Sequence, residues 1–259
     1  MHINFETALT DFPKYIESFK SEFFNNKIIH VHIPKTAGTS FLSIVRSLYD
    51  KERIKTIDWK DIHANFDKFL IEWDTGKEYD FITGHFRHYD FSKLDLRNVP
   101  YKVITFLRHP IERLISEYRY MCTEVHPWHE KFKKDHPNFE SFVMSDMVIP
   151  NSLSKILVGE FKTVYEVLEK MKEKYLFIGL SEYYHFYSNL LYEGIGMKYI
   201  PGERKNVTKS NPSNKIEIEY SLYQKLNNIH QIDIQLYDYF YRSTSKIVND
   251  YIKYKATTP

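Results

Sequence analysis

The chain has 259 residues, of which 42% are hydrophobic and 27% are charged. This length allows one α/β domain with a substantial core, and the composition is that of a soluble globular protein. A net charge of +2 argues against a dedicated nucleic-acid binder, which is usually strongly basic. The single cysteine, Cys122, excludes an intramolecular disulfide and a zinc site built from several cysteines.

Residues 1–24 carry acidic side chains and no long apolar run, so they do not resemble a signal peptide or a membrane anchor. No window approaches the roughly 18 uninterrupted apolar residues of a spanning helix. We therefore expect a soluble, cytoplasmic protein, although a chain from which an anchor had been removed would show the same pattern. The sequence gives no indication of the oligomeric state.

Short apolar runs alternate with segments of helical periodicity along the chain. The predicted strands are Lys27–Ile33, Tyr79–His85, Tyr101–Arg108 and Lys174–Glu182. The helices between and after them are expected at about Thr39–Tyr49, His109–Met121, Thr163–Lys172 and Glu182–Tyr192. Strands that alternate with helices predict an α/β fold with a central parallel sheet covered on both faces. Such sheets bind ligands at the carboxyl ends of their strands.

The sequence contains no internal repeat and no linker rich in Gly, Pro or Ser. We therefore expect a single domain over residues 1–259, with its ligand-binding core at about 27–210. Residues 215–255 carry apolar and aromatic side chains at helical spacing, which predicts helices that pack against this core.

The segment Pro34–Ser40, PKTAGTS, joins the first predicted strand to its helix. Backbone N–H groups of this turn and of the first helical turn point into one concavity, where the helix dipole adds positive potential. Lys35 supplies a full charge, and Gly38, next to Ala37, permits close approach to the backbone. Further hydroxyl donors come from Thr36, Thr39 and Ser40. An ordinary N-cap turn is the alternative, but this concentration of donors favours anion binding.

A second polar turn follows the third strand, where Arg108 stands at the strand end and Pro110 suits a first helical turn. Four residues then share one helical face at spacings of three and four: His109, Glu112, Arg113 and Ser116. Arg108 and the Ser116 hydroxyl could clamp a terminal phosphate dianion. Alternatively, Arg108 pairs with an acid and Ser116 is solvated. Two such turns after two parallel strands imply a ligand with two separated anionic groups.

With both turns in view, the sequence resembles the sulfotransferases that use 3′-phosphoadenosine 5′-phosphosulfate (PAPS), and among them the carbohydrate type. The family's 5′-phosphosulfate loop is matched by Pro34–Ser40. Its 3′-phosphate motif is matched by Arg108, Pro110, Arg113 and Ser116. The resemblance implies a sulfotransferase fold of the P-loop-kinase type.

Later segments extend the resemblance toward heparan sulfate 2-O-sulfotransferase. The run TGHFRHYDF, Thr83–Phe91, matches a segment that holds a catalytic histidine, here His85. Ile149–Glu160 and Phe177–Leu191 resemble later blocks of that family. Glu203–Ser210 stands where the family has a loop closing over the nucleotide, so two further nucleotide contacts are expected there, Asn206 and Lys209. One departure is Thr83, where those enzymes carry a second histidine.

The resemblance implies in-line transfer of a sulfuryl group from PAPS to an acceptor hydroxyl, with 3′,5′-ADP as the product. His85 is the expected general base, and Lys35 is expected to stabilise the leaving oxygen. If His85 is not the base, the next candidates are Glu117, Glu124 and His88. No metal is expected. The expected acceptor is a hydroxyl on a glycan or glycoconjugate; its identity and the sulfated position are not indicated.

Two other function classes remain open from the sequence. A P-loop kinase or NTPase would place its lysine at the end of the loop and an acidic metal ligand at a strand end, whereas Lys35 precedes Gly38. A non-catalytic nucleotide- or glycan-binding module would keep both turns and lack a competent base. The segment Cys122–Pro137 is interpreted as a surface excursion near the acceptor, where Trp128 is a hypothetical sugar-stacking side chain or simply solvated.

Overall fold

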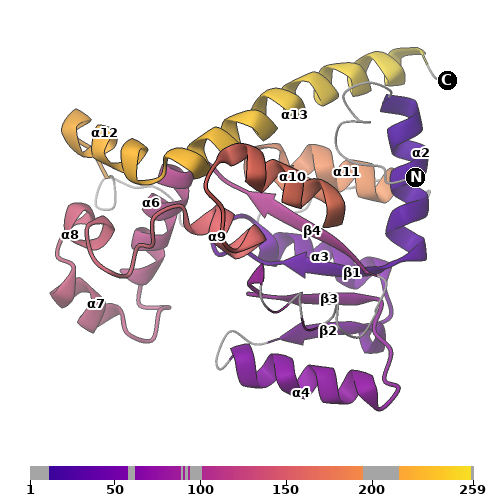
Figure 1. Cartoon of the computed structure of the whole chain (residues 1–259), viewed down its shortest axis with the longest axis horizontal. Helices are drawn as coiled ribbons and strands as arrows, with labels where there is room; N and C mark the ends of the chain where they lie inside the picture. Colours follow the sequence, from indigo (N-terminus) through magenta and orange to yellow (C-terminus); the bar gives the residue numbers. More distant parts are fainter. Residues whose placement is uncertain are drawn as a thin grey trace.

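A computed structural model describes residues 12–57, 62–88, 90, 93, 101–194 and 216–257. Its centre is a five-stranded sheet with the strand order β2-β3-β1-β4-β5, in which every neighbouring pair is parallel (Figure 1). The strands are β1 Lys27–Val31, β2 Ile54–Ile57, β3 Phe81–Gly84, β4 Tyr101–Leu107 and β5 Tyr175–Leu180. The predicted α/β fold with a central parallel sheet is therefore confirmed.

The four strands predicted from the sequence all form, each ending within a few residues of its expected bound. The strand β2 was not predicted. It is only four residues long, and three of them are partly or fully exposed. A short strand at the edge of a sheet therefore shows no apolar run that marks it in the sequence.

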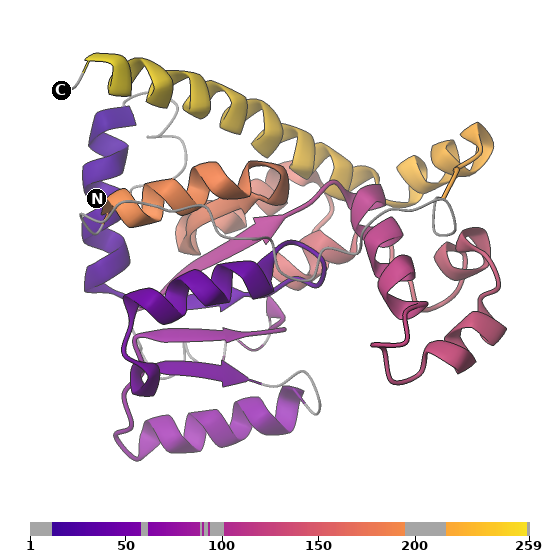
Figure 2. The same cartoon turned by 180° about the vertical axis from the view of Figure 1, so that it is seen from behind.

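Helices cover both faces of the sheet. The long helices are α2 Phe12–Asn25, α3 Gly38–Leu48, α4 Ile62–Asp74, α6 Pro110–Met121, α10 Val164–Lys174, α11 Tyr184–Gly194, α12 Tyr220–Ile229 and α13 Gln231–Thr257. Shorter ones are α7 His129–Asp135, α8 Phe139–Val143 and α9 Ser152–Val158. One face carries α2, α3 and α11, and the other carries α9 and α10. The helix α13 runs past β5 and contacts helices of both layers, and α4 lies beside β2 (Figures 1 and 2).

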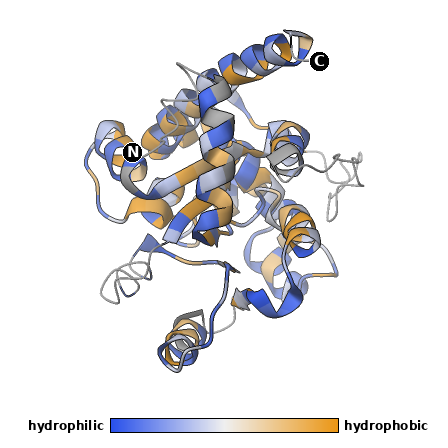
Figure 3. Cartoon of the chain, turned by 90° about the vertical axis from the view of Figure 1, so that its right-hand side faces the viewer, coloured by the Kyte–Doolittle hydropathy of each residue, from blue (hydrophilic) through white to orange (hydrophobic). Residues whose placement is uncertain are grey.

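The main core lies between these layers. All six residues of β5 are buried, as expected for a strand covered on both faces. On the α3 side, the ring of Phe106 contacts those of Phe41, Phe177 and Tyr187 at centroid distances between 5.0 and 6.2 Å. The helices carry hydrophobic and hydrophilic residues side by side (Figure 3), so each buries one face and exposes the other.

A second, smaller hydrophobic cluster lies beside the main one. Its buried members come from α6, α7, α8 and α12, and they are Ile111, Leu114, Ile115, Phe132, Phe139, Phe142, Val143 and Leu226. The helices α7 and α8 project to one side of the sheet in Figure 1. We call this group the α6–α8 lobe. The expected single domain over the whole chain stays a prediction.

The helices α9 and α13 cap each other's N-termini. The carboxylate of Asp233, on α13, accepts hydrogen bonds from the backbone N–H groups of Leu153 and Ser154 at 2.9 and 2.8 Å. In return, the side-chain oxygen of Asn151 accepts from the N–H groups of Ile232 and Asp233 at 3.0 and 3.2 Å. This buried exchange fixes the C-terminal helix to the block Ile149–Glu160.

Within the described ranges, no helix combines the length and the apolar character that crossing a membrane requires.

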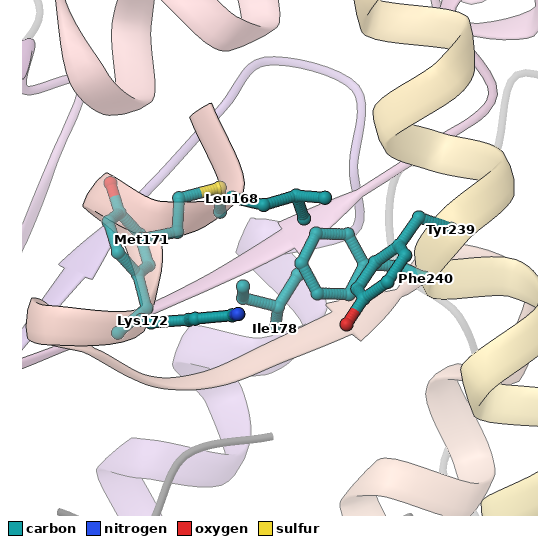
Figure 4. Close-up of a pocket in the computed structure, with 7 residues that line it drawn as sticks. Leu168, Met171, Lys172, Ile178, Tyr239 and Phe240 are labelled. Carbon is teal, nitrogen blue, oxygen red and sulfur yellow. The ribbon is translucent and has the colours of Figure 1, made fainter. Parts of the chain in front are cut away.

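A cavity of about 20 Å³ lies between α10, β5 and α13 (Figure 4). Its lining residues are Leu168, Met171, Lys172, Tyr175, Ile178, Tyr239 and Phe240. None of the predicted site residues lines it, and it has room for little more than a water molecule.

Candidate functional site

The direction of the strand order changes between β1 and β4. These two strands are neighbours, but the chain leaves β1 toward β2 and leaves β4 toward β5. Connections that diverge in this way open a crevice at the strand ends, which is the usual ligand site of a parallel sheet. Lys35 lies in the turn after β1, His85 directly follows β3, and Arg108 directly follows β4. The topology therefore brings the predicted site residues to the same end of the sheet, where the strands have their carboxyl ends.

The turn after β1 has an unusual backbone. Lys35 and Ala37 both have positive φ angles, of 69° and 74°. This conformation costs roughly 1–2 kcal/mol for a residue with a Cβ atom, so the surrounding structure must impose it. Thr36 lies between them and is buried, and its hydroxyl donates to the Ile33 carbonyl at 2.8 Å. Backbone of alternating hand curls its N–H groups toward one side and forms an anion-binding concavity.

The N-terminus of α3 completes this concavity. Ala37 occupies the N-cap position, and no side chain caps the first turn. The N–H groups of the following residues are therefore open to an external acceptor, since Ala cannot supply the oxygen that Ser, Thr, Asp or Asn would. Within this turn the side chain of Thr39 is exposed, whereas that of Ser40 is buried.

Gly38 begins α3 because no other residue fits there. A Cβ atom at this position would lie 2.0 Å from Cδ2 of His32, far inside van der Waals contact. The imidazole of His32 thus occupies the space above Gly38. Burial lowers the pKa of His32 to about 3, and electrostatic interactions with His85 and Lys35 act in the same direction. The ring of His32 is therefore neutral at physiological pH.

His85 is fixed from two sides by His32. Its Nδ1 donates to the His32 carbonyl oxygen at 2.6 Å, and the two imidazole rings stack with centroids 4.5 Å apart. A carbonyl oxygen can only accept, so the neutral His85 ring carries its proton on Nδ1. The lone pair then lies on Nε2, the atom that could accept a proton from a substrate.

Thr83 is the residue that departs from the 2-O-sulfotransferase pattern, and it lies in β3, two residues before His85. It is buried in β3, and its hydroxyl is 2.9 Å from Nδ1 of His30 on the neighbouring strand. His30 is itself buried, and burial holds its pKa well below the ordinary value. The pair is thus a neutral hydrogen bond inside the sheet.

Lys35 points from the turn toward α6. Its Nζ lies 4.1 Å from the centroid of the Tyr120 ring. Burial lowers the pKa of Lys35; Glu117 opposes this shift, and Arg108 adds to it. Two parts of the predicted site, the turn after β1 and the strand end at Arg108, therefore lie within electrostatic reach of each other.

The helix α6 carries the second predicted motif, which lies at the carboxyl end of β4. Arg108 is partly exposed and its guanidinium lies 3.7 Å from the Glu112 carboxylate. Arg113 is buried and donates to Glu117 at 2.6 Å. Ser116 is half-buried on the helix face between these residues and Tyr120. The expected contacts at Asn206 and Lys209 lie outside the described residues.

Three histidines lie near the end of β1, and they are His30, His32 and His85. Across the ranges that the structure describes, no three His, Cys, Asp or Glu side chains converge as a metal site. The histidines near β1 stack on one another, at centroid distances of 5.7 Å for His30 and His32 and 4.5 Å for His32 and His85. Nδ1 of His85 is hydrogen-bonded to the His32 carbonyl, and Nδ1 of His30 to the Thr83 hydroxyl.

A parallel sheet with an anion-binding turn after its central strand is typical of α/β proteins that bind phosphorylated ligands. The family model described as the Sulfotransferase family matches residues 24–240 of this chain. The chain therefore belongs to the sulfotransferase family. The resemblance predicted from the two turns is confirmed at the level of the family.

Individual relatives are similar over a smaller part. Heparan sulfate 2-O-sulfotransferase 1 of Mus musculus is 33% identical over 104 residues, which cover 36% of this chain and 29% of that protein. The Homo sapiens protein is 32% identical over the same length and coverage. The match thus spans less than a third of these relatives. Mouse sulfotransferase SULT7A1 complexed with PAP aligns with a TM-score of 0.42 at 13% identity, over 82% of this chain and 69% of that chain.

Two residues near the site were not assigned a contact there from the sequence. The spacing between His32 and Gly38 does not reveal that the His32 ring fills the space beside Gly38. Tyr120 stands seven residues after Arg113 and four after Ser116. That spacing places Tyr120 on the same helical face, so the periodicity of the helix could have indicated it.

Proposed function

We propose that the protein transfers the sulfuryl group of PAPS to a hydroxyl group of a carbohydrate. The observation that carries this proposal is the meeting of three features at one sheet edge: the turn of Lys35, the strand end at Arg108, and His85 with its proton on Nδ1. Membership of the sulfotransferase family supports the reaction class. The partial similarity to heparan sulfate 2-O-sulfotransferases supports a glycan acceptor.

The residues at this edge fit a nucleotide with two separated anionic groups. The turn Pro34–Ser40 would hold the 5′-phosphosulfate through its N–H groups and Lys35, because its left-handed residues and uncapped helix form a concavity for an anion. Arg108 and Ser116 would hold the 3′-phosphate, since both lie at the β4 end of the crevice. The contacts expected from Asn206 and Lys209 belong to this proposal as well.

PAPS supplies the sulfuryl group: the acceptor oxygen bonds to sulfur as the bond from sulfur to the bridging oxygen breaks. In this proposal Nε2 of His85 takes the proton of the acceptor hydroxyl. Its orientation is fixed beforehand by the hydrogen bond to the His32 carbonyl and by stacking on the His32 ring. Lys35 places its ammonium group where negative charge grows on the leaving oxygen.

The test of the reaction uses the full chain. Calorimetry with 3′,5′-ADP in the presence of EDTA is expected to show tight binding, because the proposed contacts involve no metal. Incubation with PAPS and a panel of glycans, read by mass spectrometry, is expected to show addition of a sulfuryl group. Mg²⁺-dependent binding of ATP would instead favour a kinase or NTPase. Nucleotide binding without transfer to any acceptor would favour a non-catalytic module.

The site assignment is tested by three single variants. His85→Ala is expected to lower kcat by about 100-fold or more, since a general base contributes this much. Lys35→Ala is expected to lower kcat by about 100- to 1,000-fold, the usual effect of losing a donor to a developing anion. His88→Ala tests an alternative base and is expected to retain activity. Full activity in both His85→Ala and Lys35→Ala would refute the assignment.

A further inference from the structure

The ammonium group of Lys35 rests on the face of an aromatic ring. Its Nζ lies 4.1 Å from the centroid of Tyr120, and Lys35 reaches this ring from a backbone held at a φ angle of 69°. Tyr120 lies in the last turn of α6, which follows β4, whereas Lys35 belongs to the turn after β1. The contact therefore joins the two halves of the candidate site. At this distance a cation is attracted by the negative face of the ring.

We propose that Tyr120 is a positioning residue for Lys35, whose ring holds the ammonium group at the nucleotide turn without itself touching the nucleotide. This inference rests on the proposed function of Lys35. A lysine side chain has four rotatable bonds and loses much conformational freedom when it is placed. A ring that seats the ammonium group before the substrate arrives removes part of that cost from substrate binding.

Several charged or titratable groups face Lys35, from every element around it. His32 comes from the end of β1, Arg108 from the end of β4, and Glu117 and Tyr120 from α6. Burial and Arg108 favour the neutral amine, whereas Glu117 favours the ammonium form. The ring face also favours the ammonium form, because its quadrupole attracts a cation. Only the charged form can stabilise a leaving oxygen.

A ring suits this position better than a second carboxylate. Glu117 already accepts a hydrogen bond from the buried Arg113 at 2.6 Å, so its charge is shared with that guanidinium. Another full negative charge beside Lys35 would repel the incoming anion. The aromatic face attracts the ammonium group and leaves its net charge in place. It therefore holds Lys35 without competing for the substrate.

The ring of Tyr120 is itself supported on another side. His126 packs its ring against that of Tyr120 in an edge-to-face arrangement, with centroids 5.4 Å apart and an interplanar angle of 83°. His126 is buried, and its Nδ1 accepts from the N–H of Trp128 at 3.4 Å. The segment after α6 thus supports Tyr120, which makes the ring a fixed surface for the lysine.

The proposal is tested by initial-rate kinetics of the full chain, with PAPS and the acceptor each varied in turn. Tyr120→Leu removes the ring and is expected to lower kcat/KM for PAPS by about tenfold, the effect of one partly buried cation–π contact. Tyr120→Phe keeps the ring and is expected to stay within about twofold of the wild type. The KM for the acceptor is expected to remain unchanged in both. The alkaline limb of kcat/KM for PAPS is expected to move to lower pH in Tyr120→Leu.

Tyr118→Leu is the matched control, because Tyr118 lies on the same helix and packs its ring against Phe132 and Phe142 in the α6–α8 lobe. It is expected to leave kcat/KM for PAPS unchanged. If Tyr120→Leu does not fold, as judged by circular dichroism, Tyr120→Met provides a second ring-free variant. Wild-type kinetics in the ring-free variant would overturn the proposal. So would an equal loss in Tyr120→Phe, since the hydroxyl and not the ring would then be responsible.

A second measurement separates this proposal from the proposed function. The titration of Lys35 can be followed by NMR of its labelled side chain, with the signal assigned by its loss in Lys35→Arg. Tyr120→Leu is expected to lower the pKa of Lys35, and Tyr120→Phe to leave it near the wild-type position. That result would support the positioning of Lys35 by Tyr120 even if the protein transferred nothing from PAPS. An unchanged pKa of Lys35 in Tyr120→Leu would refute the proposed role of Tyr120, whatever the activity.

Discussion

At the scale of single residues, Gly38 connects the turn that we propose binds an anion with the histidine pair. Its missing side chain leaves room for the ring of His32, which in turn stacks on His85. The same residue begins α3, whose first turn has no side-chain cap. One position therefore sets both the proposed phosphate contact and the orientation of the proposed base.

Gly38→Ala is expected to destabilise the protein by about 1–3 kcal/mol, because the new methyl group overlaps the His32 ring. Displacement of that ring is also expected to lower kcat, since His85 would lose its stacking partner. Urea unfolding and initial rates measure the two effects. The double variant Gly38→Ala/His32→Ala is expected to regain most of the lost stability. A single variant as stable as the wild type would show that the ring moves away without cost.

At the scale of helices and strands, the contact between α9 and α13 is formed by polar groups. Asp233 is buried and accepts from the N–H groups of Leu153 and Ser154 and from the Ser154 hydroxyl. Desolvation raises the pKa of Asp233, while these hydrogen bonds and the charge of Arg113 lower it. The carboxylate is thus tolerated only because several donors surround it.

Asp233→Ala is expected to lower the free energy of unfolding by about 2–4 kcal/mol, because two buried N–H groups of α9 lose their acceptor. Asp233→Asn keeps one acceptor oxygen but turns its NH2 group toward the other N–H group, so it is expected to cost less than Asp233→Ala. Thermal or urea unfolding of both variants gives the comparison. Equal losses in the two variants would mean that a single acceptor oxygen does not stabilise this junction.

The elements themselves were largely predictable from the sequence. The strands β1, β3, β4 and β5 are buried on both faces, so each is a short continuous apolar run. The edge strand β2 was missed because half-exposed residues alternate too weakly over four positions. The C-terminal helices were expected, but their attachment through Asn151 and Asp233 was not, since the two residues are 82 positions apart.

Within the site, the sequence predicted which residues lie near one another, but it did not predict the contacts between side chains of separate loops. The edge at which Lys35, His85 and Arg108 lie could be predicted, because strand ends of a parallel sheet share one side. The seat of Lys35 on Tyr120 and the support of His85 by His32 could not. They depend on how side chains from separate loops pack, which no spacing in the sequence records.

At the scale of the whole molecule, buried histidines link stability to pH. Burial lowers the pKa of His32 to about 3 and that of His230 to about 4, from an ordinary value of 6.5. Below pH 6.5 the unfolded chain takes up protons on these rings while the folded chain does not. The unfolded state then binds more protons, so the stability present above pH 6.5 is lost as the pH falls toward 4.

His230 offers the cleaner test because it lies between α12 and α13, at the junction with α9. Its Nδ1 accepts from the N–H of Asn151 at 3.3 Å, and within the described residues its buried Nε2 has no hydrogen-bond partner. His230→Asn keeps an acceptor and removes the titrating group. The slope of unfolding free energy against pH between about 6 and 5 is expected to fall by about 1.4 kcal/mol per pH unit.

The exposed residue His185, replaced in the same way, is the control, and the slope of His185→Asn is expected to match the wild type. Urea unfolding at a series of pH values measures all three proteins under the same conditions. His30 and His32 remain in every variant and also contribute to the slope of unfolding free energy against pH. The slope of His230→Asn is therefore expected to be smaller than that of the wild type but not zero. A slope in His230→Asn equal to that of the wild type would mean that His230 takes up its proton without unfolding, and that the α9–α13 junction accommodates the charge.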